Sequence, residues 1–317
     1  MANDNDLLGK KSRARGKSKD LQLQLHAVNS VTKSYSAAKN LPQAVLKVSS
    51  YGHGSSKVGA HVNYINRNGE LEVEDPAGNK IQDPAELKEL MNEWASDFDK
   101  RKNSRDTVNI VLSAPIGSSR PAVEKSVREF AKETFGDSND YLFAMHDDTE
   151  HPHGHLVVKM RGYDGEKLDP RKEDLKLWRE TFAKKMRSNG IEVDASPRFE
   201  RGQGRKSTKQ AIVNIRKRGE TPTVDKQALN EITKEIKDGV SQKGKEWAVK
   251  SKKKTHEHKK SLYESAKIVS ELAEDGTMKK MAEEVKAYAK RIPEPKTRAE
   301  EIEHAALNRN KNNDIER

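Results

Sequence analysis

The chain has no cysteine, few aromatic residues and no long apolar run. Without cysteine, disulfides and thiolate metal ligands are excluded. Aromatic residues make up 5% and hydrophobic residues 32% of the 317 residues, while 35% are charged. This balance is too polar to build a core along the whole chain, so we expect the core to be concentrated in one part.

Segments that would insert into a membrane are also missing. A bilayer-spanning helix needs about 20 predominantly apolar residues, and no window of this sequence approaches that. The N-terminal stretch "MANDNDLLGKKSRARGKSKD" has no apolar run of the kind found in secretory signals. We therefore expect a soluble cytoplasmic protein with no membrane insertion.

Positive charge is abundant and unevenly distributed. Residues 201–260 contain 18 Lys and Arg against 7 Asp and Glu, a net charge of +11 that equals the formal net charge of the whole chain. Such a block favours a polyanionic partner, nucleic acid first. The alternative is a solvated helix face, which is the commoner role of Lys-rich segments.

The composition and the apolar patterning of the sequence predict three regions. Residues 1–40 are polar and lack periodicity, so we expect a flexible basic arm. Residues 41–200 contain the alternating and helical apolar patterns of a packed domain. Residues 201–317 are rich in Lys and Glu and predict a basic, largely helical C-terminal region, with breaks at 218–225 and 291–298.

Within the middle region the apolar patterns predict the element order β-α-α-β-α-β-β-α. The predicted strands are 44–50, 106–115, 141–148 and 153–163, and the predicted helices are 57–69, 83–98, 121–135 and 170–190. This order is typical of an α+β fold with a mainly antiparallel central sheet flanked by helices.

The stretch "MHDDTEHPHGHLVVKM" (145–160) holds four of the chain's ten histidines. Residues i and i+2 of a strand face the same side, so His153 and His155 should lie together while Gly154 faces away. His146 ends the preceding strand and should lie opposite this pair. Three imidazoles arranged in this way predict a metal site with open positions, and a hydrogen-bonded polar loop is the alternative. His151, beside Pro152, is expected at the rim.

A second pair, His256 and His258, occurs in "KKTHEHKK" (253–260). Its lysine neighbours oppose a divalent cation, so we assign it to a solvated helix. At the first site, three histidines with open positions suit hydroxide generation or polarisation of a phosphoryl oxygen. In a chain without cysteine, phosphoryl transfer to the protein would need Tyr, Ser or Thr as nucleophile.

Three motifs in order resemble those of conjugative relaxases, the DNA-nicking transesterases of the HUH endonuclease superfamily. "HVNYINRNGELE" (61–72) resembles the first motif, "NIVLSAPIG" (109–117) the second and "HDDTEHPHGH" (146–155) the third. The match is closest to the P-type mobilisation branch, which includes the Agrobacterium T-DNA border nuclease. The resemblance covers residues 44 to about 200, and it implies an HUH relaxase-like fold.

The resemblance assigns the catalytic nucleophile to Tyr64. Among the seven tyrosines, Tyr51, in the Gly-rich turn 51–56, is the alternative. Strand alternation makes His146, His153 and His155 the expected metal ligands, and His151 could be a fourth.

Asp148 and His151 are candidates for activating Tyr64, chosen by their nearness to the histidines in the sequence. Two positions depart from the family pattern: Gly154 replaces a bulky apolar residue, and Ala114 replaces an aromatic one.

DNA contacts are assigned in the same way. The second motif implies contacts near the cleavage site from Ser113 and from Asn109, which stands where relatives often have His. The first motif adds the basic residue Arg67. The segment directly after the predicted domain adds further expected phosphate contacts: Arg198, Arg201, Arg205 and Lys206.

The activity implied by the resemblance is site- and strand-specific nicking of single-stranded DNA at an origin of transfer. Nicking would proceed through a 5′-phosphotyrosyl intermediate and start conjugative transfer or mobilisation of a plasmid or integrative element. The family works with Mg or Mn, and three imidazoles also suit Zn, Ni or Co.

The resemblance also implies relaxosome accessory proteins and a type IV coupling protein as partners, a monomer on DNA, and export with the DNA through type IV secretion. Three alternatives stay open: a rolling-circle replication initiator, a hydrolytic metallonuclease and a non-enzymatic DNA-binding mobilisation accessory protein.

Overall fold

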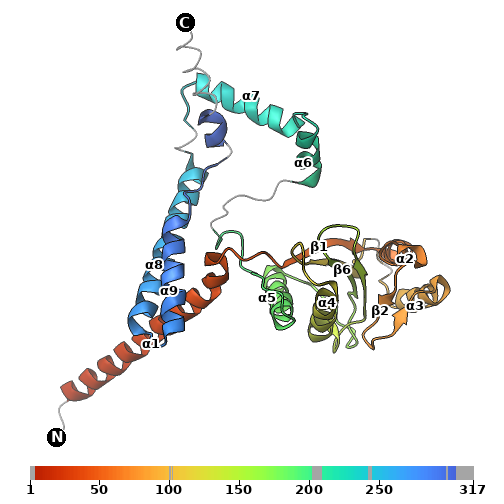
Figure 1. The fold of residues 1–317 in the computed structure, drawn as a ribbon, viewed down its shortest axis with the longest axis horizontal. Coiled ribbons are helices and arrows are strands. Elements are labelled where there is room, and N and C mark those ends of the chain that lie inside the picture. The colour runs from red at the N-terminus through yellow and green to blue at the C-terminus, as the bar shows by residue number, and fades with distance from the viewer. Residues whose placement is uncertain are drawn as a thin grey trace. The chain divides into compact units, whose positions relative to one another are not determined.

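The chain divides into two compact units (Figure 1). A computed structural model describes residues 4–99, 101, 103–201, 209–241, 245–297 and 299–304. The first unit, here called the sheet unit, is Asn40–Ala195, and the second, the helical unit, combines Met1–Lys39 with Ser196–Arg317. The sequence instead places the N-terminal arm, the domain and the C-terminal region in three successive segments. The joining of the two chain ends in one unit was not predicted.

The sheet unit is built on a six-stranded sheet in the order β1-β4-β6-β5-β2-β3, and every pair of neighbours is antiparallel. The strands are β1 Val45–Gly52, β2 Val73–Glu74, β3 Lys80–Ile81, β4 Thr107–Ser113, β5 Tyr141–His146 and β6 His153–Lys159. The predicted α+β class with a mainly antiparallel sheet is confirmed by these pairings. The hairpin of β2 and β3 was not predicted, because two-residue strands are too short to show an alternating pattern.

Helices cover both faces of this sheet. One face packs against α4 (Arg120–Phe135) and α5 (Lys172–Ser188), and the other against α2 (Gly54–Ile65) and α3 (Pro84–Ser96). Side chains of successive strand residues point to opposite faces, so each strand supplies both layers. Strand residues facing α4 and α5 include Ile110, Leu112, Phe143, Leu156 and Val158. Those facing α2 and α3 include Leu142, Ala144 and Val157.

Local sequence signals explain where α2 and α3 begin. Asp83 accepts a hydrogen bond from the backbone N–H of Ala85, and Pro84 occupies the first turn of α3, as the Asp–Pro signal predicts. Helix α2 begins earlier than predicted, at Gly54, directly after β1. A Cβ at Gly52 would lie 2.3 Å from Thr107 Oγ1 and 2.7 Å from Val58 Cγ2. Glycine at 52 therefore permits the close approach of α2 to the sheet.

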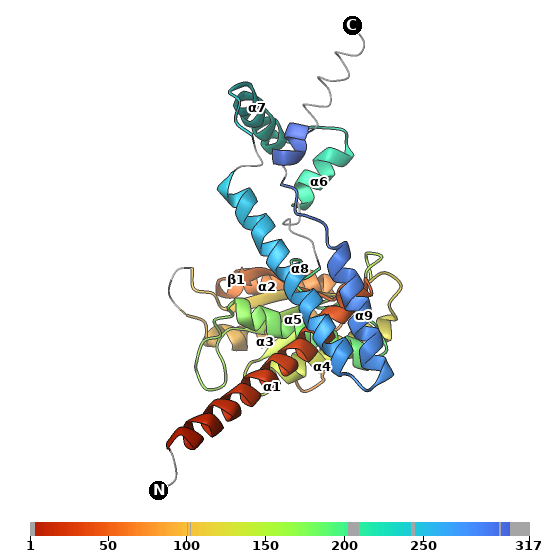
Figure 2. The same cartoon turned by 90° about the vertical axis from the view of Figure 1, so that its left-hand side faces the viewer.

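The helical unit has a core of three helices: α1 (Asp4–Ala38), α8 (Glu246–Leu272) and α9 (Gly276–Arg291). Figure 2 shows α8 and α9 beside α1. Ala27 and Val31, one helical turn apart, are fully buried against these helices. The predicted flexible arm over 1–40 is therefore wrong for this part of the chain. A polar segment with two small apolar residues at i and i+4 presents too narrow a stripe to be recognised without its partner helices.

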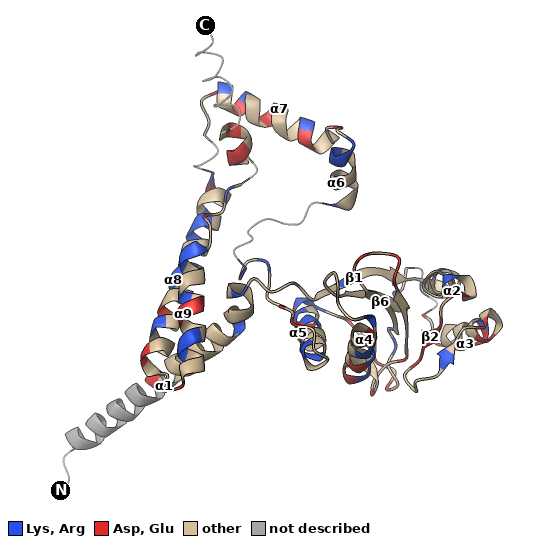
Figure 3. Ribbon diagram, in the orientation of Figure 1, with Lys and Arg blue, Asp and Glu red and all other residues tan. Residues whose placement is uncertain are grey.

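The remaining helices of this unit are α6 (Gln210–Lys217) and α7 (Thr223–Lys237). The predicted break at 218–225 covers the gap between α6 and α7 together with the first three residues of α7, and the one at 291–298 begins at the last residue of α9. Lys and Arg residues recur along α8 (Figure 3). Among the described residues, no helix has the length and hydropathy that a membrane span requires.

Candidate active site

Three histidines converge where β5 and β6 pair. His146 lies opposite His153 in the register, and His155 lies opposite Ala144. One potential ligand nitrogen from each of the three imidazoles lies within 4.8 Å of the other two. The ring centroids of His146 and His155 are 4.4 Å apart, and those of His153 and His155 are 5.2 Å apart. This is the convergence that strand alternation predicts.

Hydrogen bonds to carbonyl groups orient two of these imidazoles. Nε2 of His146 donates to the carbonyl of Ile65 at 2.8 Å, and Nδ1 of His153 donates to the carbonyl of His151 at 3.0 Å. Because a carbonyl only accepts, the proton of each neutral ring lies on that nitrogen. The lone pairs of His146 Nδ1 and His153 Nε2 are therefore the ones available to a metal, as in established metal sites.

Burial favours the neutral form of two of these imidazoles. Burial, together with the neighbouring His146 and His153, lowers the pKa of His155 to about 3. Burial also lowers the pKa of His146, against the opposing hydrogen bond to Ile65. Neutral imidazoles with free lone pairs are good ligands for a divalent cation. The donor set therefore fits the metal that the resemblance implies.

Tyr64 lies beside this cluster. It is carried by α2, whose buried face packs on the sheet, and its own side chain is 52% exposed. Its ring centroid is 6.0 Å from that of His155 and 6.3 Å from that of His146. Tyr51, the alternative nucleophile, packs against the core on the α4 and α5 face, under the guanidinium of Arg105. The structure thus brings Tyr64, rather than Tyr51, to the histidines.

Arg67 joins the groups of the site. It follows α2 in a turn where Arg67 and Asn68 have φ of 54° and 55°, a left-handed conformation uncommon for residues other than glycine. Its guanidinium carbon lies 5.3 Å from the centre of the Tyr64 ring, and its Nη2 donates to His146 Nδ1 at 3.3 Å. The same nitrogen forms an ion pair with Asp148. The sequence assigns Arg67 to DNA, whereas the structure shows it bonded inside the site.

The two candidate bases lie on the loop between β5 and β6. Burial acts to raise the pKa of Asp148, but Arg67 and His153 bring it below its ordinary value, which makes Asp148 a weaker base. His151 donates through Nδ1 to the carbonyl of Ala114 at 3.0 Å. Within the described residues, neither side chain forms a hydrogen bond to the Tyr64 hydroxyl. Their role as bases stays a prediction.

The two second-motif residues have different surroundings. Ser113 lies opposite His153 in the pairing of β4 with β6 and is half-buried on the histidine face. Asn109 is 2% exposed, and its amide nitrogen donates to Ser50 Oγ at 2.9 Å beside the bulge in β1. The amide of Asn109 is thus buried and bonded within the sheet unit, and its contact with DNA stays a prediction.

Four expected phosphate contacts follow the sheet unit in the sequence. Arg198 and Arg201 belong to the helical unit, where Nε of Arg201 donates to the carbonyl of Ser196 at 3.2 Å. Arg205 and Lys206 lie outside the described residues. Their assignment to DNA stays a prediction.

Two further residues at the site were missed as site residues. The ring of His61 stacks on Tyr64 with centroids 6.0 Å apart, and burial lowers the pKa of His61. Its position three residues before Tyr64, on the same side of the helix, was the available signal. Arg120, at the start of α4, forms an ion pair with Asp147 of the histidine loop. No sequence pattern indicates that pairing.

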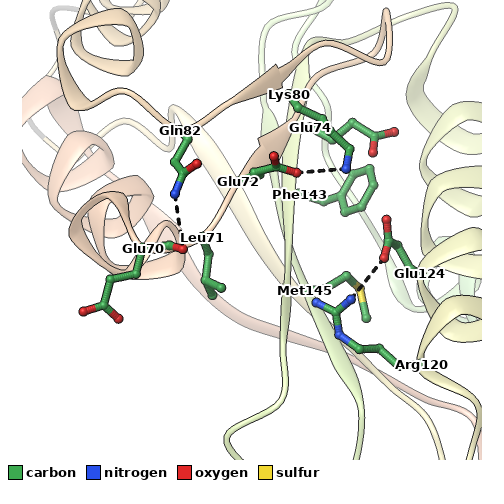
Figure 4. A pocket seen from close by; sticks show the side chains of 10 residues that line it. All are labelled: Glu70, Leu71, Glu72, Glu74, Lys80, Gln82, Arg120, Glu124, Phe143 and Met145. Carbon is green, nitrogen blue, oxygen red and sulfur yellow. Dashed lines mark hydrogen bonds and ion pairs between the residues drawn. The ribbon is translucent and has the colours of Figure 1, made fainter.

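Arg120 also lines a cavity of about 340 Å³ beside this loop (Figure 4). Leu71, Phe143 and Met145 provide apolar surface, and Lys80 forms an ion pair with Glu72 across it. The cavity contains four carboxylates: Glu70, Glu72, Glu74 and Glu124. These charges disfavour a phosphate there, so the cavity is distinct from the histidine cluster in chemistry as well as position.

Comparison with known proteins shows that the sheet unit is similar to one family of nucleases. Residues 64–191 match the family model described as relaxase, MobA/VirD2-like, nuclease domain. The T-DNA border endonuclease VirD2 of Rhizobium rhizogenes is 33% identical over 159 residues, which cover 44% of this chain and 36% of that protein. VirD2 of Agrobacterium fabrum is 32% identical over 159 residues, with the same coverage of 44% and 36%. The chain thus spans little more than a third of the length of these relatives.

The solved structures that were found include one described as "Molecular Basis of Vancomycin Resistance Transfer in Staphylococcus aureus". Its TM-score is 0.35 at 17% identity, over 49% of this chain and 99% of that chain. A TM-score this low does not establish a common fold. The family resemblance predicted from the three motifs is confirmed by the match over residues 64–191.

Proposed function

We propose that this chain, whose residues 64–191 match the relaxase nuclease domain, nicks single-stranded DNA at an origin of transfer. In this proposal Tyr64 is the nucleophile, and the product is a 5′-phosphotyrosyl enzyme with a free 3′-hydroxyl on the cleaved strand. The reaction would start conjugative transfer or mobilisation of the DNA element that carries the origin.

The observation that carries this proposal is the position of Tyr64. Its ring centroid lies 6.0 Å from that of His155, although the two residues come from α2 and from β6. A transesterase needs a nucleophile and a group that stabilises the charge on phosphorus at one place. Tyr64 would be the nucleophile, and the three imidazoles would hold a cation that stabilises the charge on the phosphate oxygens.

The chemistry assigns a task to each group. The Tyr64 oxygen forms a bond to phosphorus while the bond from phosphorus to the 3′-oxygen breaks, and the 3′-oxygen takes up a proton. A divalent cation held by His146, His153 and His155 would polarise the phosphate oxygens. The family metals Mg and Mn are proposed first, and imidazole ligands also suit Zn, Ni or Co.

The phenol of Tyr64 must lose its proton, and phenols ordinarily have a pKa of about 10. Asp148 and His151 remain the proposed acceptors. His61 joins them, because burial lowers its pKa and keeps its imidazole neutral and able to accept a proton at neutral pH.

The remaining functional assignments concern the DNA and the partners. Ser113 is proposed to contact the strand near the scissile phosphate, because it lies directly opposite His153. Residues 201–260, with a net charge of +11, are proposed to hold the DNA backbone through Lys and Arg. Accessory proteins, a coupling protein and export by type IV secretion are proposed by analogy with conjugative relaxases.

The proposal is tested with a pool of single-stranded oligonucleotides of random sequence, because no cognate origin needs to be assumed. The full chain is incubated with the pool and Mn²⁺ and denatured, and the DNA that stays attached to protein is sequenced. We expect one enriched sequence in a denaturant-resistant adduct. Tyr64→Phe should reduce the adduct by at least about 1000-fold, since the attacking oxygen is absent.

Tyr51→Phe is the matched control, because it removes a hydroxyl from the other face of the same sheet. It should form as much adduct as the unchanged chain. Cleavage without any adduct would indicate a hydrolytic nuclease and contradict the proposal. An adduct that persists in Tyr64→Phe would assign the nucleophile elsewhere.

A further inference from the structure

Arg67 occupies a central place in the site that its expected role in DNA binding does not explain. The nitrogen Nη2 contacts both His146 and Asp148, and the guanidinium carbon lies 5.3 Å from the centre of the Tyr64 ring. Its side chain is 32% exposed, so this is a partly enclosed position. The left-handed backbone at Arg67 and Asn68 turns the chain back over the end of α2.

His146 has only one lone pair to offer. Its Nε2 carries the proton that is donated to the Ile65 carbonyl at 2.8 Å, and the residue is 1% exposed. The remaining acceptor is Nδ1, and this atom accepts from Arg67 at 3.3 Å. A neutral imidazole that donates from one nitrogen binds a metal through the other. Arg67 therefore uses the lone pair that a metal would require.

Arg67 and a metal cannot use that lone pair together. An ion bound to imidazole lies about 2 Å from the nitrogen, and the Arg67 nitrogen lies 3.3 Å from the same atom. An ion on this lone pair would be in steric contact with the guanidinium and would also repel it as a like charge. The two cations therefore exclude each other at Nδ1.

We propose that Arg67 competes with the divalent cation for Nδ1 of His146, so that metal binding requires the guanidinium to move away. This inference rests on the metal site of the proposed function and adds a residue that sets its affinity. The ion pair with Asp148 holds Arg67 in the competing position. When Arg67 moves, the Asp148 carboxylate, 3.6 Å from His153 Nε2, loses its partner beside the cation site.

The test measures Mn²⁺ binding to the full chain by titration calorimetry, without DNA. Arg67→Asn removes the guanidinium, and asparagine tolerates the left-handed backbone at this position. We expect Arg67→Asn to bind Mn²⁺ about tenfold more tightly or better, because a hydrogen bond from a charged donor no longer competes. Circular dichroism and thermal unfolding verify that the variant is folded.

Arg105→Ala is the matched control, because the Arg105 guanidinium lies 4.3 Å from the centre of the Tyr51 ring, away from the histidines. It should leave Mn²⁺ affinity unchanged. Arg67→Lys keeps the positive charge on a compact ammonium and should bind Mn²⁺ with an affinity between those of the unchanged chain and Arg67→Asn.

Equal or weaker Mn²⁺ binding in folded Arg67→Asn would overturn the competition. A second variant, His155→Ala, then separates the two proposals. If His155→Ala no longer binds Mn²⁺, the metal site and the proposed function still stand, and only the competition by Arg67 fails. If His155→Ala has no effect on Mn²⁺ binding, the histidine site is not the metal site, and both proposals fail at that step.

Discussion

The two His-x-His pairs of this chain have the same spacing and different surroundings. His153 and His155 lie in β6, where a two-residue period places both imidazoles on one face of the sheet. His256 and His258 lie in α8, where residues two apart point about 200° apart around the axis. In that helix His256 is exposed and the ring of His258 packs 4.9 Å from that of Phe199.

The comparison shows that the period of the backbone decides what a histidine pair can bind. The strand pair gains a third imidazole from its neighbour β5, whereas the helix pair is divided between solvent and protein. The expectation of a solvated helix is correct for His256 and wrong for His258, which is half-buried. The Phe199 ring that His258 contacts also has the ammonium group of Lys254 over it.

The largest effect on metal binding and adduct formation should come from removing the strand pair. Replacing His153 and His155 together by Ala removes two of three ligands, so Mn²⁺ affinity should fall by at least about 100-fold and the DNA adduct should disappear. Replacing His256 and His258 by Ala should leave both unchanged. Calorimetry and the adduct assay measure these outcomes. Loss of metal binding in the second double variant would show that spacing alone, without strand geometry, makes the site.

The residue between the two histidines provides a smaller effect. A Cβ at Gly154 would lie 3.0 Å from Val127 Cγ2 and 3.3 Å from Met145 Sδ. Gly154→Val should therefore overpack the α4 face and lower the free energy of unfolding by about 1–3 kcal/mol.

Adding Val127→Ala to Gly154→Val should recover part of that loss in denaturant unfolding. Glu257→Leu, between the helical pair, is the control. Glu257 is exposed, so its replacement should change the free energy of unfolding by at most about 0.5 kcal/mol. A fully stable Gly154→Val chain would mean that α4 does not constrain this position.

The effect of moderate acidity on the free energy of unfolding of the sheet unit should be smaller still. The pKa of His155 is about 3 when folded, and its ordinary value is 6.5. Below pH 6.5 the unfolded chain therefore binds a proton at His155 that the folded chain does not, so stability falls as the pH is lowered. At pH 5 the loss amounts to at most about 2 kcal/mol.

Two buried tryptophans of the sheet unit, Trp94 and Trp178, report its unfolding. The variant Trp247→Phe removes the tryptophan fluorescence of the helical unit. Denaturant titrations of this variant at pH 7 and pH 5 then give the difference in the free energy of unfolding of the sheet unit. His155→Gln in the same background should reduce the change in the free energy of unfolding between pH 7 and pH 5. An unchanged difference would indicate that His155 is not the group that titrates.

Much of the sheet unit was predictable because its signals are local. Alternation in 153–163 determines which side His153 and His155 face, and the Asp83–Pro84 pair marks the start of α3. The buried state of Asn109 was not predictable, because it depends on Ser50 of a neighbouring strand. Helix α1 was misjudged for the same reason, since its narrow apolar stripe acquires meaning only from α8 and α9.

The sequence by itself determined the strand period and the three motifs in order, and the resemblance carried by those motifs gave Tyr64 as the proposed nucleophile. Only the tertiary structure decided which atoms of those residues are available. The hydrogen bond from His146 to Ile65 selects Nδ1 as the free nitrogen, and Arg67 then reaches that nitrogen across 79 residues of sequence. Such contacts depend on how a helix end and two strands pack together, and no local pattern of residues encodes that distance.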